Sequence, residues 1–298
     1  MSAVAIGNFD GVHCGHRALI SRARTLAAAS TARTVALTFH PHPSAVLSPQ
    51  GAQRMLASLE RRVELLRAAG ADEVVVEPFT RELASLSADA FIDDVVIRRL
   101  GARAIVVGYD FNYGHARSGS TETLAAHCAR ANIDLSVVPP VEAAGEVCSS
   151  SRIRRYLEAG DLAAAERLLG RRWDIDGIVV HGAKRGRAIG IPTANIAPTS
   201  DLVVAPGIYA VTLGVVDGPP TLQAMPAVAS LGTNPTFVDQ GGLVLEVHVL
   251  DWDGDLYDRK VRTTFVARLR DEARYDGVDA LLAQIRRDID DARMILRH

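Results

Sequence analysis

The sequence has few cysteines, and Cys14, Cys128 and Cys148 show no Cys-x-x-Cys spacing. An odd number of scattered cysteines argues against a disulfide framework and is typical of proteins from a reducing compartment. The sequence also lacks an N-terminal basic segment followed by an apolar core, and no apolar run approaches the ~18 residues that a membrane-spanning helix needs. These absences predict a cytoplasmic protein without a membrane partner.

Charge of one sign is not concentrated anywhere. Lys and Arg number 33 against 35 for Asp and Glu, which gives a formal net charge of −2. Without a block rich in Lys or Arg, a nucleic acid is not an expected partner, and a small molecule is. Internal repeats and low-complexity segments are absent as well. What is present is a chain of 298 residues, 48% of them hydrophobic, which is enough for two domains with separate cores.

The hydrophobic pattern changes along the chain. Up to about residue 138, strands and helices are expected to alternate as in a parallel α/β sheet, over residues 3–6, 17–29, 34–39, 59–69, 73–76, 88–100 and 104–108. Two helices follow, one ending near residue 159 and one capped by Asp161 and ending at Leu169. Beyond Trp173 the turns become rich in Gly and Pro, and strands are expected over residues 175–180, 208–213, 227–231, 243–250 and 262–267. This second pattern predicts a β-barrel with a terminal helix over residues 278–295 and a boundary near Gly170.

Three unusual segments, residues 7–16, 39–43 and 108–114, follow strands of the expected sheet. Ligands of such sheets bind beyond the carboxyl ends of the strands, so these segments are expected to converge. In the first, glycines and two imidazoles stand between an apolar run and a helix, where backbone N–H groups and the helix dipole attract anions. His13 and His16 are expected to donate hydrogen bonds to ATP phosphates. A purely structural turn and a zinc site are the alternatives, although no Cys or acidic cluster near His-x-x-His completes a zinc ligand set.

These segments carry a resemblance to a known family. Gly-x-Phe-Asp-Gly-x-His-x-Gly-His resembles the signature of the nucleotidylyltransferases, in the branch that adenylylates FMN. Residues 108–114 resemble the Gly-x-Asp-Phe-x-Phe-Gly segment of the same enzymes with Tyr113 in place of Phe, and residues 149–154 resemble their Ser-Ser-Thr-x-Ile-Arg motif with Ser151 in place of Thr. The resemblance implies an ATP site of Gly7, Phe9, Asp10, Gly11, His13, Gly15, His16, Asp110, Ser150, Ser151 and Arg154, with the two imidazoles as catalytic residues. For the flavin side it implies Asn8, Phe39, His40, Pro41 and Asn112.

The second half carries a different motif. Residues 181–195 combine glycines with Lys184, Arg185 and Arg187, but not in Walker A order, and a solvated basic turn is the alternative reading. The tail, Gly-Ile-Pro-Thr-Ala-Asn, resembles the Gly-Phe-Pro-Thr-Ala-Asn motif of riboflavin kinases. This resemblance implies an ATP site of Gly182, Lys184, Arg187, Gly190, Pro192, Thr193 and Asn195. Thr193 and Asn195 would also be oxygen ligands of Mg²⁺.

Two further residues are expected on the flavin side of the kinase site. Glu246 stands among apolar neighbours on an expected strand and is the candidate general base that takes the proton from the ribityl hydroxyl. Arg270 belongs to a segment that matches the family's flavin loop only generally, and it is expected to contact the flavin.

Together the motifs resemble the bacterial bifunctional riboflavin kinases and FMN adenylyltransferases along nearly the whole chain. The resemblance implies a Rossmann-like nucleotidylyltransferase domain with a parallel sheet over residues 1–170 and an antiparallel β-barrel riboflavin kinase domain over residues 171–298. Such a transferase phosphorylates riboflavin to FMN and adenylylates FMN to FAD, using ATP and Mg²⁺. Because only Met1 and Ser2 precede the first motif strand, an enzyme with one of the activities is an alternative.

Two further alternatives belong to other classes. One is a flavin-binding sensor without turnover, and the other is a tRNA-charging enzyme, whose Lys-Met-Ser-Lys-Ser motif is missing here. A homo-oligomer is left open.

Overall fold

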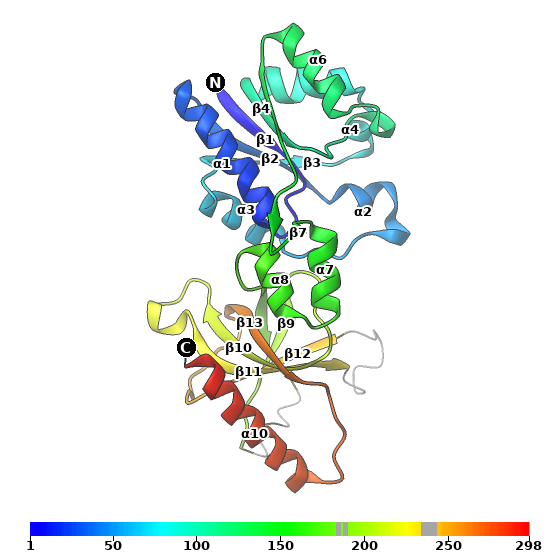
Figure 1. Ribbon diagram of the computed structural model, residues 1–298. Coiled ribbons are helices and arrows are strands. Elements are labelled where there is room, and N and C mark those ends of the chain that lie inside the picture. Colours follow the sequence, from blue (N-terminus) through cyan, green and yellow to red (C-terminus); the bar gives the residue numbers. More distant parts are fainter. Residues whose placement is uncertain (183–185, 187–189, 234–242, 298) are drawn as a thin grey trace. The chain divides into compact units, whose positions relative to one another are not determined.

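The computed structural model describes residues 1–182, 186, 190–233 and 243–297. The chain forms two compact units (Figure 1). The first consists of Met1–Arg54 and Leu59–Ser150, and the second of Met55–Ser58 and Ser151–His298. The short segment Met55–Ser58 therefore belongs to the second unit, although the first unit surrounds it in sequence. The expected boundary near residue 170 separates the two predicted functional domains, and it stays a prediction.

The first unit is built on five parallel strands in the order β3-β2-β1-β4-β5. The strands are β1 (Ser2–Ile6), β2 (Arg33–His40), β3 (Glu73–Pro78), β4 (Ala102–Gly108) and β5 (Asp134–Val138). The helical elements are α1 (Cys14–Ala29), α2 (Pro43–Leu47), η1 (Pro49–Gly51), α3 (Leu59–Ala68), α4 (Arg81–Ser85), α5 (Ala88–Ala90), the π-helix η2 (Phe91–Arg99), η3 (His115–Arg117) and α6 (Thr121–Ala131). A small hairpin of β6 (Glu142–Ala143) and β7 (Glu146–Val147) follows. The expected parallel α/β sheet is confirmed.

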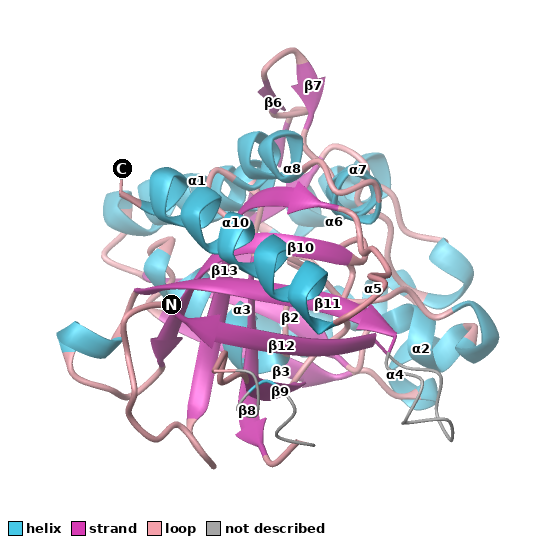
Figure 2. Cartoon of the chain, turned by 90° about the horizontal axis from the view of Figure 1, so that it is seen from below, coloured by secondary structure: helices cyan, strands magenta, loops and turns pink. Residues whose placement is uncertain are grey.

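The second unit contains a closed antiparallel barrel in the order β10-β11-β12-β9-β8-β13. Its strands are β8 (Asp174–Val180), β9 (Ala194–Pro198), β10 (Gly207–Val215), β11 (Met225–Thr233), β12 (Leu243–Val249) and β13 (Lys260–Arg270). The helices are α7 (Ser150–Glu158), α8 (Leu162–Leu169), η4 (Pro220–Leu222) and α10 (Val278–Leu296). Figure 2 shows α10 crossing the outside of the barrel strands. The expected barrel and terminal helix are confirmed, and β9 is an additional strand.

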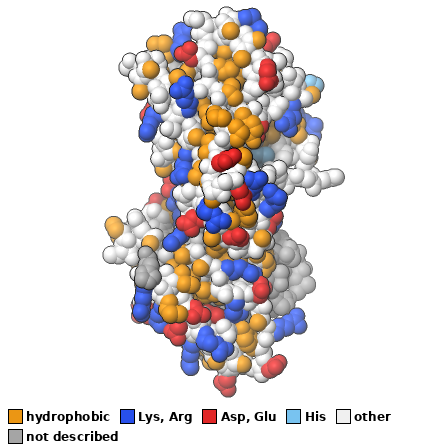
Figure 3. All heavy atoms as spheres, in the orientation of Figure 1, with side chains coloured by type: hydrophobic (Ala, Val, Ile, Leu, Met, Phe, Trp, Pro, Cys, Tyr) orange, Lys and Arg blue, Asp and Glu red, His pale blue; other side chains and the backbone are white. Residues whose placement is uncertain are grey.

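The helices of the described residues include none that is both long enough and apolar enough to cross a membrane. On the face drawn in Figure 3, Lys and Arg side chains are interspersed with Asp and Glu side chains. This mixture agrees with the nearly balanced charge of the sequence.

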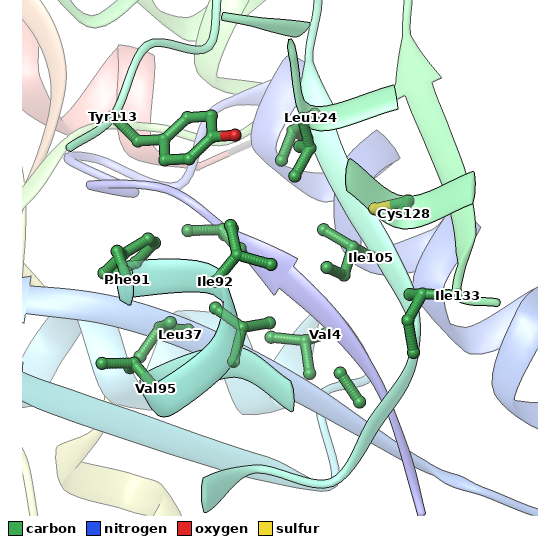
Figure 4. Close-up of a cluster of buried hydrophobic side chains, with 14 of the residues drawn as sticks. Val4, Leu37, Phe91, Ile92, Val95, Ile105, Tyr113, Leu124, Cys128 and Ile133 are labelled. Atoms are coloured by element: carbon green, nitrogen blue, oxygen red, sulfur yellow. The ribbon is translucent and has the colours of Figure 1, made fainter. Parts of the chain in front are cut away.

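Alternation along β1 divides the core of the first unit into two layers. Val4 and Ile6 pack on one face of the sheet against η2 and α6, in the cluster of Figure 4. Ala3 and Ala5 face α1 and α3 on the other side. Both layers follow from the period of two in an extended strand, because a strand covered on both faces needs apolar residues at every position.

The expected helix over residues 17–29 begins three residues earlier, at Cys14. His13 is its N-cap residue, and the His13 Nδ1 atom accepts a hydrogen bond from the backbone N–H of His16 at 3.4 Å. An imidazole therefore does here what Ser, Asp or Asn does at most helix starts. The consequence is that both histidines of the motif lie at the first turn of α1.

The barrel core depends on the segment Met55–Ser58. Trp173 is buried against Phe265, with ring centroids 5.1 Å apart. Its indole N–H donates to the carbonyl oxygen of Leu56 at 2.9 Å, and the Leu56 side chain is itself fully buried. The backbone N–H of Met55 donates to Asp201 at 2.7 Å. The second unit thus uses these residues for its own packing and hydrogen bonding.

Candidate active sites

The first candidate site lies where β1 passes into α1. The intervening backbone turns sharply, with positive φ at Phe9 (51°), Gly11 (76°) and Val12 (44°). A Cβ atom at Gly15 would come within 3.1 Å of the His13 ring, so a glycine leaves room for the imidazole. The turn ends at the first turn of a helix of 16 residues, whose N-terminus favours a bound anion.

The two imidazoles of this motif form a stacked pair. The ring centroids of His13 and His16 are 3.6 Å apart with an interplanar angle of 20°, and the edge of Phe9 packs against His16. Burial lowers the pKa of His13 from 6.5 to about 4. The pKa of His16 is lowered well below its usual value by burial first, and then by His13 and Arg62. Both rings are therefore neutral near pH 7.

Neutral imidazoles can still act on phosphates as hydrogen-bond donors. Because His13 Nδ1 accepts the hydrogen bond of the helix cap, the proton of this ring is on Nε2. His16 Nδ1 is buried and has no hydrogen-bond partner among the described residues. The arrangement offers N–H donors without a fixed positive charge.

The second segment follows β2. The Phe39 side chain packs into the core against Phe79 and Phe91, so its expected flavin contact is left to its backbone and to its neighbours. His40 is exposed and precedes a cis peptide bond to Pro41. The position of this loop at the carboxyl end of a strand beside β1 agrees with the expected convergence, and the flavin contacts of Phe39, His40 and Pro41 stay predictions.

The third segment follows β4, the other neighbour of β1. Phe111 stacks on Tyr113 with ring centroids 5.2 Å apart, and Tyr113 is buried against Phe91. Asp110 and Asn112 are exposed, and the Asn112 amide donates to the Asp110 carbonyl oxygen at 2.7 Å. The aromatic residues therefore anchor the loop and leave the two polar residues exposed, and the roles of these two stay predictions.

The start of α7 is in contact with the first motif. Ser150 donates from Oγ to the backbone carbonyl of Asp10 at 2.9 Å, and Asp10 is buried. Within the first unit, this contact places Ser150 of the predicted pyrophosphate motif beside Asp10 of the predicted ATP motif. Ser151 and Arg154 lie on α7 within the second unit, and their contacts with phosphate stay predictions.

The second candidate site lies on β9 and β12. Glu246 is directly opposite Asn195 on β9 and Ser230 on β11. Leu245 and Val247 on either side of Glu246 are fully buried in the barrel, so Glu246 faces away from the interior. Residues directly opposite in an antiparallel pair share a face, so the expected base and one expected metal ligand lie side by side.

Two glycines of the preceding segment approach the expected metal ligands. A Cβ atom at Gly182 would lie 2.2 Å from the Asn195 amide nitrogen, and one at Gly186 would lie 3.4 Å from the Thr193 hydroxyl oxygen. Gly190 has a φ of 78°. Lys184, Arg185 and Arg187 lie outside the described residues. The described glycines allow a loop backbone to pass close to Thr193 and Asn195.

The donors present here fit Mg²⁺. Thr193 and Asn195 offer hydroxyl and amide oxygens, and the Glu246 carboxylate lies opposite Asn195. Within the described part of the chain, no group of three or more His, Cys, Asp or Glu side chains could hold a metal. A small set of oxygen donors suits Mg²⁺, which keeps waters and substrate phosphates among its ligands.

His248 was not assigned a role by its sequence. It lies two residues beyond Glu246 on the same face of β12, and its Nδ1 donates to the carbonyl oxygen of Pro192 at 2.7 Å. This bond joins β12 to the residue just before Thr193, where the ladder to β9 has already ended. Alternation along β12 could have indicated the shared face with Glu246.

Arg270 is held by the terminal helix. Its Nε and Nη2 atoms donate to Asp288 at 2.9 and 2.7 Å, and Asp288 is buried. The Tyr275 ring lies 5.8 Å from the guanidinium carbon. Arg270 therefore joins β13 to α10, and its expected flavin contact stays a prediction.

Known proteins resemble this chain over nearly its whole length. A family model described as FAD synthetase matches residues 1–152, and one described as riboflavin kinase matches residues 169–296. A protein of Listeria monocytogenes named bifunctional riboflavin kinase/FMN adenylyltransferase is 37% identical over 97% of this chain and 91% of its own length. A protein of the same name from Pseudomonas fluorescens is 38% identical over 97% of this chain and 91% of its own.

Among solved structures, one described as a macrolide-efflux protein from Streptococcus pneumoniae matches with a TM-score of 0.86 and 31% identity. The match covers 98% of this chain and 94% of that one. With both family models in this order and full-length relatives at this identity, the chain belongs to the family of bifunctional riboflavin kinases/FMN adenylyltransferases.

Proposed function

We propose that this chain phosphorylates riboflavin to FMN in its second unit and adenylylates FMN to FAD in its first. The observation that carries the proposal is that this chain matches both family models. Each match covers the half of the chain that contains the corresponding motifs. Riboflavin, FMN and ATP are then substrates, and FMN, FAD, ADP and pyrophosphate are products.

In adenylyl transfer, an oxygen of the FMN phosphate attacks the α-phosphorus of ATP and pyrophosphate leaves. No protein nucleophile is needed, because such reactions depend on positioning and on stabilisation of charge. His13 and His16 donate hydrogen bonds to the phosphates at the start of α1, and Ser150, Ser151 and Arg154 hold the pyrophosphate. Asn8, His40, Pro41 and Asn112 bind the flavin nucleotide, with Phe39 contributing its backbone.

In riboflavin phosphorylation, Glu246 takes the proton from the ribityl hydroxyl as its oxygen attacks the γ-phosphorus of ATP. Thr193 and Asn195 would hold Mg²⁺, which when bound would neutralise phosphate charge. The ATP phosphates are bound by Gly182, Gly190 and Pro192, and Arg270 contacts the flavin. The position of Asn195 opposite Glu246 supports this assignment.

We also propose that the protein acts in the cytoplasm without a nucleic-acid partner. All three cysteines are free thiols, two of them buried, which suits a reducing compartment.

A time course tests the function. The purified chain is incubated with riboflavin, ATP and Mg²⁺, and flavins are separated by chromatography. FMN is expected first and FAD after it, and a parallel reaction supplied with FMN is expected to give FAD directly. FMN without FAD in both reactions would leave only the kinase, and bound riboflavin without ATP consumption would indicate a sensor.

A further inference from the structure

Arg62 is a buried cation in the first unit. It lies on α3 with 1% of its surface exposed, on the same helix face as the fully buried Leu66. Burial lowers the pKa of Arg62, and attraction to Asp10 acts in the opposite direction. A guanidinium stays protonated in proteins. Arg62 therefore places a permanent positive charge at the carboxyl ends of β1 and β2, where adenylyltransferase motifs lie.

The guanidinium joins two strand ends. Nη1 donates to the carbonyl oxygen of Asn8 at 2.8 Å, and Nη2 donates to the carbonyl oxygen of Phe39 at 3.2 Å. Asn8 follows β1 within the phosphate motif, and Phe39 lies at the end of β2, beside the expected flavin loop at His40 and Pro41. The planar fork of one side chain thus fixes the distance between the two segments proposed to hold the two substrates.

The charge of Arg62 has neutral hydrogen-bond partners. Both acceptors are backbone carbonyls, and Nε is buried without a hydrogen-bond partner among the described residues. Burial of a charge costs free energy that neutral acceptors offset only in part. The field of Arg62 also reaches the phosphate motif, since it contributes to the lowered pKa of His16. A phosphate group bound beside these imidazoles would add its negative charge to that of Asp10, which already attracts Arg62.

We propose that Arg62 is a positioning residue for adenylyl transfer, which holds the Asn8 and Phe39 peptides in the geometry where the FMN phosphate meets the α-phosphorus of ATP. Its charge favours binding of both phosphate groups. One FMN phosphate oxygen forms a bond to the α-phosphorus, the bond from this phosphorus to the bridging oxygen of the β-phosphate breaks, and pyrophosphate leaves with that electron pair. Arg62 takes part in neither bond. The inference rests on the proposed function.

The test uses the full chain with Arg62→Met, Arg62→Lys and, as a matched control on the same helix, Arg67→Met, which alters an exposed arginine. For Arg62→Met, kcat for FMN adenylylation should fall about 100-fold and KM for FMN should rise about tenfold. Arg62→Lys keeps the charge but not the fork, so KM should return to within about threefold of the wild type while kcat stays about tenfold low. Riboflavin phosphorylation in the same preparations and both activities of Arg67→Met should be unchanged.

Adenylylation constants of both Arg62 variants within about twofold of the wild type would overturn the proposal. If Arg62→Met does not fold, as judged by circular dichroism, Arg62→Lys decides: a loss confined to the adenylylation kcat supports the proposal. Wild-type adenylylation kinetics, or an equal loss of both activities, overturn it. A wild-type chain that forms no FAD from FMN and ATP would refute the proposed adenylylation itself, and this inference with it.

Discussion

Replacing His13 by asparagine should make the first unit less sensitive to acid. In the folded chain burial lowers the pKa of His13 to about 4, against 6.5 for an ordinary imidazole. Between these pH values the unfolded chain binds a proton that the folded chain does not, so the free energy of unfolding falls as the pH falls. This contribution is fully present above pH 6.5 and fully lost below pH 4. Asparagine does not titrate, and its side-chain oxygen can still accept the hydrogen bond from the His16 N–H.

The magnitude follows from the two pKa values. A difference from 6.5 to about 4 corresponds to about 3 kcal/mol once the pH is below both, and to about 2 kcal/mol at pH 5. Loss of the stacking between His13 and His16 shifts the stability of the variant by the same amount at every pH. The quantity to compare is therefore the change in unfolding free energy between pH 7 and pH 5.

Hydrogen exchange of amides in peptides from β1 and α1, followed by mass spectrometry, measures this change within the first unit. Both tryptophans, Trp173 and Trp252, lie in the second unit, so their fluorescence follows the barrel separately. His115→Asn, at an exposed histidine of the first unit, is the control and should lose stability as the wild type does. If the unfolding free energy of His13→Asn falls from pH 7 to pH 5 by the same amount as that of the wild type, to within about 0.5 kcal/mol, burial of His13 is not a cause of the acid sensitivity.

Three further results are expected. Glu246→Gln should reduce FMN formation by about 10² to 10⁴-fold while FAD formation from supplied FMN continues, as measured by chromatography, and equal loss of both activities would contradict a role as base. His248→Ala should lower the kinase kcat and raise the Mg²⁺ concentration required for activity, because the hydrogen bond to Pro192 holds the segment before Thr193. His248→Asn should restore part of the activity, and an unchanged Mg²⁺ requirement in His248→Ala would count against this role. Asp288→Ala should destabilise the barrel by about 1 to 3 kcal/mol in urea unfolding followed by tryptophan fluorescence, since it leaves the partly exposed Arg270 without its buried partner. A loss below about 0.5 kcal/mol would show that α10 is held by other contacts.

The sequence predicts the parts of the fold whose patterns are local. The strand, glycine turn and helix at residues 3–29 can be predicted from hydrophobic periodicity and turn residues alone. The structure contains all of them, and only the start of the helix differs, because the His13 imidazole caps it at an earlier residue than expected. The expected helix over residues 88–100 is helical over most of its length. However, η2 is a π-helix, and no simple sequence pattern predicts this form.

Sequence patterns do not predict features that depend on contacts between distant parts of the chain. Strand β9 includes Asn195 and Pro198, which have low strand propensity, and it forms because it closes the barrel between β12 and β8. Arg62 has the sequence context of a solvated helical arginine, and only its spacing of four from Leu66 indicates a charge on the apolar face. The same limitation applies to His248, whose partner is 56 residues away in the chain.

The passage of Met55–Ser58 into the second unit bears on how the two activities could be separated in evolution or in the laboratory. The chain crosses between the units three times, so no single cut yields two complete pieces. A barrel expressed from residue 151 onward would lack the acceptor of the Trp173 indole and the buried Leu56 side chain. A separate kinase made from the second unit would need either a substitute for the segment Met55–Ser58 or a replacement of Trp173.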